Sequence, residues 1–500
     1  MEPATNTEAP DGRGLSFLAQ IGLLAGPFLS MVDSSVVTVA LPEIARGLSS
    51  TLAGAQWVVS GYLLALAAVL GFSAFLAKRY GTRRVYLASL LGFTAASAMC
   101  ALAPDIGFLI AARALQGSLG APLVPLAMSM LLGKGGAGRE MPATSGLLLF
   151  LAPAVGPALG GVLVEAFGWP SIFLVNVPLG LLGGFAVLRA VRDPGGGDRN
   201  VRPDLVGVLL LAGGLALATY GASGGPDLGW FAADVWPFWA AGGCLLGLYA
   251  LWALRREQPA VDLRLLRHPQ SALAISLCVL VSVVLFFVVF LLPVFMQDVQ
   301  GFSAFEAGVV LLPQGIVTGV GTILGDMLTR RYGVRRTVVP GMGILTAGTA
   351  ALLMVGYGTP VWLTATVLSV RGLALGLTIQ PLLAATIGDL DTREIADGNA
   401  LFNVAERLGG SAGIALLATF FQVRERLHIE GALRGVGAAG TGGRRVGMGG
   451  LGALPAGVRG RLAEAATSGF HDTVWVLVAV CALGLCAATL LGGKARPAGD

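Results

Sequence analysis

Long apolar runs separated by short charged segments form the main pattern of this 500-residue chain. The runs are 20 residues or longer, which is the length that a helix needs to cross a bilayer, and they lack the alternation of a barrel strand. The pattern therefore predicts an all-α membrane protein. We expect fourteen membrane-spanning helices, at residues 17–40, 53–77, 85–104, 107–132, 143–166, 171–190, 205–225, 235–254, 272–295, 305–328, 337–357, 361–386, 397–421 and 471–493.

Composition narrows the functional class. Hydrophobic residues make up 55% of the chain and charged residues only 12%, which is about half the charged share of a soluble domain. The five cysteines lie in apolar runs without metal-ligand spacing, the three histidines are far apart, and no phosphate-binding Gly-x-x-x-x-Gly-Lys-Ser/Thr segment occurs. We therefore expect no enzyme, no metal site and no cofactor. The net charge of +5 does not indicate a nucleic-acid partner.

The placement of lysine and arginine predicts the orientation. Basic residues follow the second, sixth, eighth and tenth expected helices, whereas the short loops on the other side contain only Arg46. Because short basic loops stay in the cytoplasm, we expect both termini there and a multi-pass chain in the membrane. Segment 422–470 would then lie outside. Residues 431–460 within it include twelve glycines, which favours a flexible extracellular loop.

A short repeat divides the chain. Lys-Arg-Tyr-Gly-Thr-Arg-Arg at 78–84 matches Arg-Arg-Tyr-Gly-Val-Arg-Arg at 330–336, and each copy follows the second expected helix of its half. Two matching halves are one design of secondary transporters. We predict an N-terminal cytoplasmic tail, a six-helix bundle, two linker helices and a second six-helix bundle that includes the glycine-rich loop, at residues 1–16, 17–190, 191–254 and 255–495.

Two charged residues lie well inside expected helices. Counted at 1.5 Å per residue, Asp33 is about 7 Å and Arg113 about 10 Å from the middle of its helix, both toward the outer face. Charges at such depth cost about 2.5–3.5 kcal/mol each and normally pair or line water. One interpretation is a static ion pair that locks two helices. The other is a proton site at Asp33, whose occupancy depends on its distance from Arg113.

Other charges in the expected helices are less informative. Structural pairing explains Arg371, Glu406 and Arg407 as well as a transport role does. Asp326 stands four residues before Arg330, which predicts an ion pair between successive turns of a helix at the membrane surface.

Small residues follow one face of the fifth expected helix. Ala152, Gly156 and Gly160 are four apart, so a neighbouring helix can approach the backbone closely. Pro157 removes one helical hydrogen bond and bends the helix. A smooth, bent helix suits a moving seam, although small-residue packing is also common in static membrane bundles.

Several segments together resemble the fourteen-helix drug:proton antiporters of the major facilitator superfamily, the EmrB/QacA type. The similarity covers about residues 15–425 and 470–495. The segments that carry it are Met-Val-Asp-Ser-Ser-Val-Val-Thr-Val-Ala-Leu-Pro at 31–42, Gln-Trp-Val-Val-Ser-Gly-Tyr-Leu-Leu at 56–64, Arg-Ala-Leu-Gln-Gly at 113–117, Ala-Pro-Ala-Val-Gly-Pro-Ala-Leu-Gly-Gly at 152–161, Leu-Pro-Val-Phe-Met-Gln-Asp-Val-Gln-Gly-Phe-Ser-Ala at 292–304, Leu-Leu-Pro-Gln-Gly at 311–315 and Arg-Gly-Leu-Ala-Leu-Gly at 371–376.

The resemblance implies the major facilitator fold and proton-driven export, with Asp33 as the proton carrier and Arg113 as its modulator. It also implies an antiporter motif, which would comprise Ala152, Gly156, Pro157, Gly160 and Gly161. It further implies a cytoplasmic gate loop, which would comprise Lys78, Arg79, Gly81, Arg83 and Arg84. Three positions depart from the family. Ala152 replaces its first glycine, Lys78 replaces an aspartate that is thought to latch the gate, and Pro170 replaces an arginine between two tryptophans.

We expect the cargo to bind midway between the two bundles. Aromatic and amide side chains typical of promiscuous pockets are the candidates to line its path, unless they only pack the core. They are Phe28, Trp57, Tyr62, Gln116, Gln314 and Gln380. The shortage of buried charge indicates a lipophilic cargo.

The expected protein is a monomeric exporter of drugs or antibiotics, surrounded by the lipids of a bacterial cytoplasmic membrane. Export of one dedicated natural product is the main alternative. Proton-coupled uptake and lipid flipping are less favoured.

Overall fold

The computed structural model describes residues 16–132, 156–191, 204–228, 232–256, 259–388, 390, 395–434 and 456–492. These residues form helices and connecting turns, and none of them belongs to a strand, which confirms the predicted all-α class. Eleven described helices are long and apolar enough to cross a membrane. Three shorter apolar helices coincide with three further expected spans, at Gly54–Leu70, Gly156–Phe167 and Leu205–Ala218.

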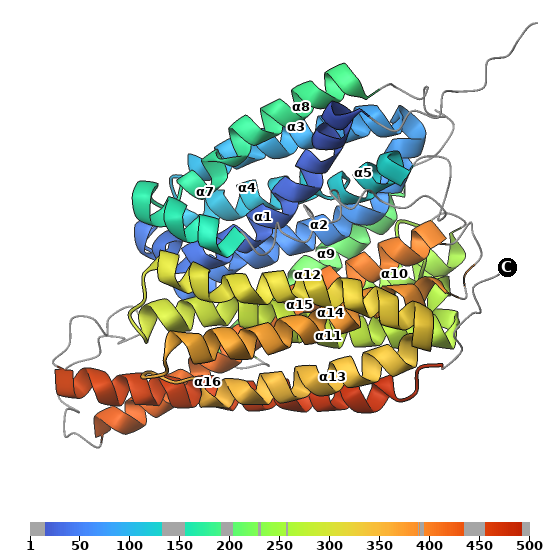
Figure 1. Ribbon diagram of the computed structural model, residues 1–500. Helices are drawn as coiled ribbons and strands as arrows, with labels where there is room; N and C mark the ends of the chain where they lie inside the picture. The colour runs from blue at the N-terminus through green and yellow to red at the C-terminus, as the bar shows by residue number, and fades with distance from the viewer. Residues whose placement is uncertain are drawn as a thin grey trace, which may run out of the picture.

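The helices of the first half form one lobe, which we call the first lobe. Its helices are α1 (Phe17–Gly47), α2 (Leu52–Tyr80), α3 (Thr82–Ala101), α4 (Ile106–Gly120), α5 (Leu123–Leu132), Gly156–Phe167, α7 (Ser171–Leu174) and α8 (Asn176–Ala190). The helix Gly156–Phe167 has no label in Figure 1, and we call it the glycine helix.

The second lobe and the linker contain the remaining helices. The linker helices are α9 (Leu205–Leu228) and α10 (Trp236–Arg255). The second lobe comprises the 3-10 helix η2 (Leu263–Arg267), α11 (Pro269–Asp298), α12 (Ala304–Tyr332), α13 (Val334–Ala350), the 3-10 helix η3 (Ala351–Met354), α14 (Val361–Ile387), α15 (Ile395–Arg434) and α16 (Ala456–Ala488).

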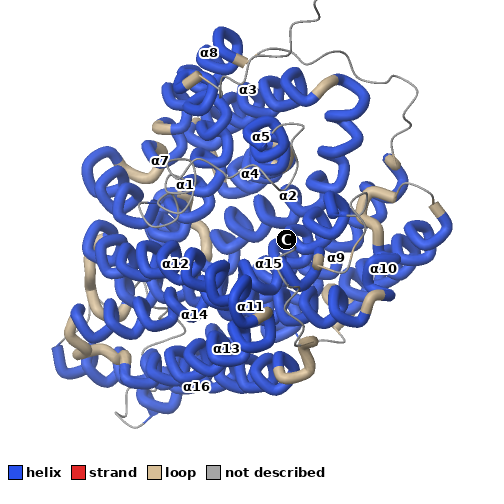
Figure 2. The backbone as a smooth tube through the Cα atoms, turned by 45° about the vertical axis from the view of Figure 1, so that its right-hand side comes forward, coloured by secondary structure: helices blue, strands red, loops and turns tan. Residues whose placement is uncertain are grey.

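The two lobes lie side by side with their helices roughly aligned, the first in blue to green and the second in yellow-green to red (Figure 1). Figure 2 shows α9 and α10 together at one side of the boundary between the lobes. Helix α9 contacts α10, α2 of the first lobe and α15 of the second. The linker is therefore packed against both lobes.

The repeated sequence forms the same turn in both lobes. Gly81 and Gly333 have φ angles of 90° and 85°, a region that glycine enters without strain. Each glycine donates its N–H to the carbonyl four residues earlier, on Ala77 and Thr329, at 2.9 Å in both cases. Each is also the single residue between two helices, so the expected gate loop at 78–84 is reduced to Gly81. The duplication predicted from the sequence therefore has a structural counterpart.

A buried aspartate organises the linker. Asp204 accepts hydrogen bonds from Gly207 N at 3.1 Å, Trp252 Nε1 at 2.8 Å and Ala260 N at 2.9 Å. These donors lie in α9, in α10 and in the segment that leads to η2. One carboxylate thus joins both linker helices to the chain that enters the second lobe.

Three expected spans differ clearly from their predicted bounds. The fourth is divided into α4 and α5 next to Pro122, which has no N–H to continue the helical ladder. Helices α15 and α16 extend through both ends of segment 422–470, where we expected a loop. Asp472 of α16 joins the extension of α15 to α16, because it accepts from Arg424 Nε and lies 2.8 Å from His428 Nε2.

Candidate functional site

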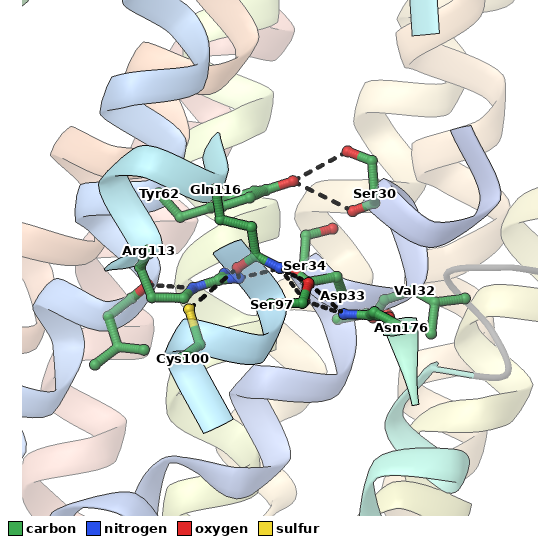
Figure 3. A network of polar contacts seen from close by, with 12 residues as sticks. Ser30, Val32, Asp33, Ser34, Tyr62, Ser97, Cys100, Arg113, Gln116 and Asn176 are labelled. Atoms are coloured by element: carbon green, nitrogen blue, oxygen red, sulfur yellow. Dashed lines mark hydrogen bonds and ion pairs between the residues drawn. The ribbon is translucent and has the colours of Figure 1, made fainter. Parts of the chain in front are cut away.

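Asp33 of α1 and Arg113 of α4 are in direct contact. Arg113 Nη1 lies 2.5 Å from Asp33 Oδ2, and both side chains are fully buried. The carboxylate faces the interior of the first lobe, where α1, α3, α4 and α8 meet (Figure 3). The pair is therefore shielded from both water and lipid in this conformation.

Two amides complete the surroundings of the carboxylate. Gln116 Nε2 donates to Asp33 Oδ1 at 3.1 Å, and Asn176 Nδ2 donates to the same oxygen at 2.9 Å. Ser97 Oγ accepts from both amides, at 2.6 Å and 3.3 Å (Figure 3). In each hydrogen bond described at Asp33, the partner donates and the carboxylate accepts. The arrangement therefore suits an ionised carboxylate.

Arg113 has several other partners besides Asp33. Its Nε donates to the Val58 carbonyl at 3.1 Å, and its Nη1 donates to Gln116 Oε1 at 2.5 Å. The guanidinium lies 4.1 Å from the centre of the Tyr62 ring, a cation–π contact strengthened by the absence of water. The Tyr62 hydroxyl is 3.0 Å from Ser30 Oγ. The guanidinium thus keeps several contacts that do not depend on the charge of Asp33.

The sequence identified only part of this site. Asp33, Arg113, Tyr62 and Gln116 were singled out, the last two as candidates to line the cargo path. Asn176 was missed, because one amide in an apolar run has no pattern to distinguish it. The only available signal was its polarity, since Asn176 is the one strongly polar side chain in α8 before its final turn.

The glycine helix lies at the boundary of the first lobe with the second. A methyl group at Gly160 would come within 3.0 Å of the Val36 carbonyl of α1, and one at Gly156 would overlap Ser35 Oγ. On another face, a methyl group at Gly161 would lie 2.5 Å from the Ala304 carbonyl of α12. The small residues therefore allow backbone contact with one helix of each lobe. Pro157 belongs to the same seam, whereas Ala152 lies outside the described residues.

Several contacts between the lobes lie near the end of the molecule at which α1 finishes, which we call the Gly47 end. Gln297 Nε2 of α11 donates to the Val39 carbonyl of α1 at 2.9 Å. Gly308 of α12 approaches the Pro157 carbonyl so closely that a methyl group there would overlap it. In the structure, the two lobes are therefore held together at the Gly47 end.

The remaining cargo candidates differ in burial and in neighbours. The Trp57 ring lies 6.1 Å from the Tyr220 ring of α9, Phe28 is half-buried against the core, Gln314 is buried in α12, and Gln380 is exposed on α14. Their role in binding cargo stays a prediction.

The expected gate residues have separate surroundings. Arg83 Nη2 donates to the Leu188 carbonyl of α8 at 3.1 Å, and Arg79 lies over the rings of Phe75 and Tyr80. Arg84 lies with Arg83 in the first turn of α3, and the side chain of Lys78 lies outside the described residues. The predicted surface ion pair of Asp326 and Arg330 is confirmed at 2.9 Å.

Arg371 of α14 is fully buried in the second lobe. Its Nε lies 3.3 Å from Thr349 Oγ1 and its Nη2 3.4 Å from the Val284 carbonyl, while Nη1 has no hydrogen-bond partner. Among the described residues no carboxylate forms an ion pair with it. Arg371 is thus on the fourth span of its lobe, as Arg113 is, but without an aspartate.

A sequence profile of the Major Facilitator Superfamily matches residues 23–414. A multidrug resistance protein B homolog of Mycobacterium tuberculosis is 34% identical over 422 residues, or 82% of this chain and 77% of that protein. A methylenomycin A resistance protein of Streptomyces coelicolor is 33% identical, over 83% of this chain and 88% of that protein. The multidrug export protein EmrB of Escherichia coli is 28% identical, over 82% of this chain and 80% of that protein.

Solved transporters have the same fold. A bacterial homologue of the human lysosomal transporter Spinster, in an inward-facing and unoccupied conformation, aligns with a TM-score of 0.64 at 16% identity, over 96% of this chain and 98% of that chain. A mutant of the nucleoside transporter NupG aligns with a TM-score of 0.60 at 11% identity, over 95% and 99%. At such identities the likeness concerns the fold alone.

Proposed function

The chain belongs to the Major Facilitator Superfamily, and from this premise we propose that it exports lipophilic drugs or antibiotics in exchange for protons. The observation that carries the proposal is the buried contact between Asp33 and Arg113. A carboxylate enclosed in a transmembrane bundle beside one cation is the kind of group that couples proton binding to movement. The relatives named for multidrug and antibiotic resistance support export as the direction.

The proposed architecture has fourteen membrane-spanning helices, as two six-helix lobes and two linker helices. Eleven described spans and three shorter apolar helices at expected positions support this count. We place both termini in the cytoplasm of a bacterium, because the basic residues gather in the short loops on that side. The Gly47 end then faces outward, and the described conformation is closed to the outside.

Proton binding at Asp33 would change the balance between conformations. While Asp33 is ionised, its attraction to Arg113 favours the conformation in which they touch. Protonation removes the negative charge while Arg113 stays charged, so conformations that separate the two become relatively more favourable. A membrane potential of 100 mV supplies about 2.3 kcal/mol for each charge that crosses.

The glycine helix would transmit this change to the opening between the lobes. Asp33 and Ser35 are two residues apart on α1, so a shift of α1 at the ion pair also moves the surface that meets Gly156. The same helix meets α12 at Gly161. A local change at Asp33 can therefore alter the contact that closes the Gly47 end.

The proposal is tested by replacing Asp33 with a neutral residue of the same shape. In inverted membrane vesicles, Asp33→Asn should abolish substrate-dependent proton movement across the membrane, because the variant has no carboxyl to protonate. Asp326→Asn is the matched control, since Asp326 forms an exposed ion pair. It should keep coupled transport near the unmodified level. Full proton movement by a well-expressed Asp33→Asn variant would exclude Asp33 as the carrier.

Export of one natural product is the second candidate. It is favoured by the Streptomyces coelicolor relative, whose name records resistance to a single antibiotic, methylenomycin A. Growth-inhibition tests in a sensitive host separate the two. Protection against chemically unrelated lipophilic compounds supports multidrug export, and protection against one compound only supports a dedicated exporter.

A further inference from the structure

Only one of the two polar atoms of the Asn176 side chain forms hydrogen bonds. Its Nδ2 donates to Asp33 Oδ1 at 2.9 Å, whereas its Oδ1 is buried and has no hydrogen-bond partner. The residue is only 1% exposed and begins α8, the helix that packs against both α1 and α3. A buried carbonyl oxygen without a donor is uncommon in proteins and requires an explanation.

The partners of Asp33 suit only one of its two protonation states. An ionised carboxylate accepts hydrogen bonds, and Arg113, Gln116 and Asn176 all donate to it. A protonated carboxyl also carries an O–H group, which needs an acceptor. Gln116 Oε1 already accepts from Arg113 Nη1 at 2.5 Å, so the free acceptor among these side chains is Asn176 Oδ1.

We propose, on the basis of the antiport function above, that Asn176 is a positioning residue that stabilises Asp33 in both protonation states. With Asp33 ionised, Asn176 donates from Nδ2. When a proton joins Asp33 Oδ1, the amide turns over and its own Oδ1 accepts the new O–H. No covalent bond other than that O–H forms or breaks. The amide thus gives the buried carboxyl a hydrogen-bond partner in both its charged and its neutral form.

The other groups around Asp33 leave this role to Asn176. The charged or titratable groups nearby are Arg113 of α4, Tyr62 of α2 and Cys100 of α3, with Arg407 of α15 acting on Tyr62 from farther away. The charged guanidinium only donates. The Tyr62 hydroxyl is engaged with Ser30 and the Cys100 thiol with Gln116. Proton binding also leaves Arg113 its contacts with the Val58 carbonyl and the Tyr62 ring.

Infrared difference spectra between neutral and acidic pH test the assignment. The unmodified protein should show a carbonyl band of protonated Asp33 that is absent from Asp33→Asn. In Asn176→Leu, which has similar volume but no polar atom, this band should move to higher frequency, because hydrogen bonding weakens the carbonyl bond. Substrate-coupled proton movement should fall about tenfold, as expected for one lost hydrogen bond, and Asn176→Gln should restore part of it. Asn403→Leu, at an amide of α15 bonded to Asn399, is the control.

The outcomes distinguish the two proposals. If Asp33→Asn still couples efflux to protons, the proposed function fails. If Asp33→Asn is inactive but a folded Asn176→Leu leaves the carbonyl band and transport unchanged, only the role of Asn176 fails.

A second measurement applies if Asn176→Leu does not fold. The chain has five asparagines, so isotope-labelled asparagine gives an assignable side-chain carbonyl signal in the unmodified sequence. On acidification, the Asn176 signal should shift to lower frequency as its oxygen gains a donor. An unchanged signal would overturn the proposal.

Discussion

At the scale of residues, the site is built from charged and amide side chains, and only the charged ones can be recognised as site residues from the sequence. Asp33 and Arg113 were predictable because charges are rare in membrane helices and costly there. Asn176 was not, because an amide costs much less and lies 143 positions from Asp33 along the chain. Only the packing of α8 against α1 brings the two together.

Arg113→Lys should reduce coupled transport at least tenfold while leaving expression near normal. Lysine keeps the charge, but its single ammonium cannot replace Nε at the Val58 carbonyl and Nη1 at Asp33 and Gln116 together. Substrate-driven proton movement in inverted vesicles measures the loss. Arg330→Lys is the control, because the Arg330 side chain is 80% exposed. Equal activity of the two variants would show that charge alone is sufficient at position 113.

At the scale of elements, the glycine helix is a spacer that meets one helix from each lobe. The sequence predicted its smooth face from the spacing of Gly156 and Gly160. The partner glycine Gly308 was not predicted, although Ala304 and Gly308 have the same spacing of four in α12. Which helix fills a smooth face is decided by the arrangement of the whole bundle.

Gly308→Ala should hold the lobes apart at the Gly47 end. The new methyl group would meet the Pro157 carbonyl, which is backbone and cannot turn aside, and such overpacking typically costs about 1–3 kcal/mol. Thiol labelling of Gln297→Cys, in a chain without its native cysteines, should become faster, and efflux should fall. Gly343→Ala is the control, because nothing lies within 4 Å of a methyl group there. Unchanged labelling in Gly308→Ala would contradict a closing role for this contact.

At the scale of the whole molecule, the two lobes share a framework but differ in chemistry. The repeat at 78–84 and 330–336 predicted the shared framework, and Gly81 and Gly333 form the same turn. The sequence could not show that the two buried arginines have unequal partners. Arg113 meets a carboxylate, whereas Arg371 meets a hydroxyl and a carbonyl. The first lobe thus contains the described acid–base pair, and its counterpart position in the second lobe does not.

Arg371→Met should therefore keep the ratio of protons to substrate within about twofold of the unmodified value. A similar-sized apolar side chain in place of a buried charge is often neutral or stabilising. Arg113→Met, by contrast, should uncouple transport, because it leaves Asp33 without its cation. Proton and substrate fluxes measured together in vesicles compare the two. Loss of coupling in a stable Arg371→Met variant would show that both lobes take part in proton exchange.

Helix α9 touches α2 of one lobe and α15 of the other, so it cannot follow both when the lobes tilt. One of its two faces must slip. Where it meets α2, the contact includes the rings of Trp57 and Tyr220, whose attraction has no single bond to break. The hairpin of α9 and α10 would thus slide along the first lobe as the lobes separate. It would cover the gap between them and keep bilayer lipid out while cargo passes through.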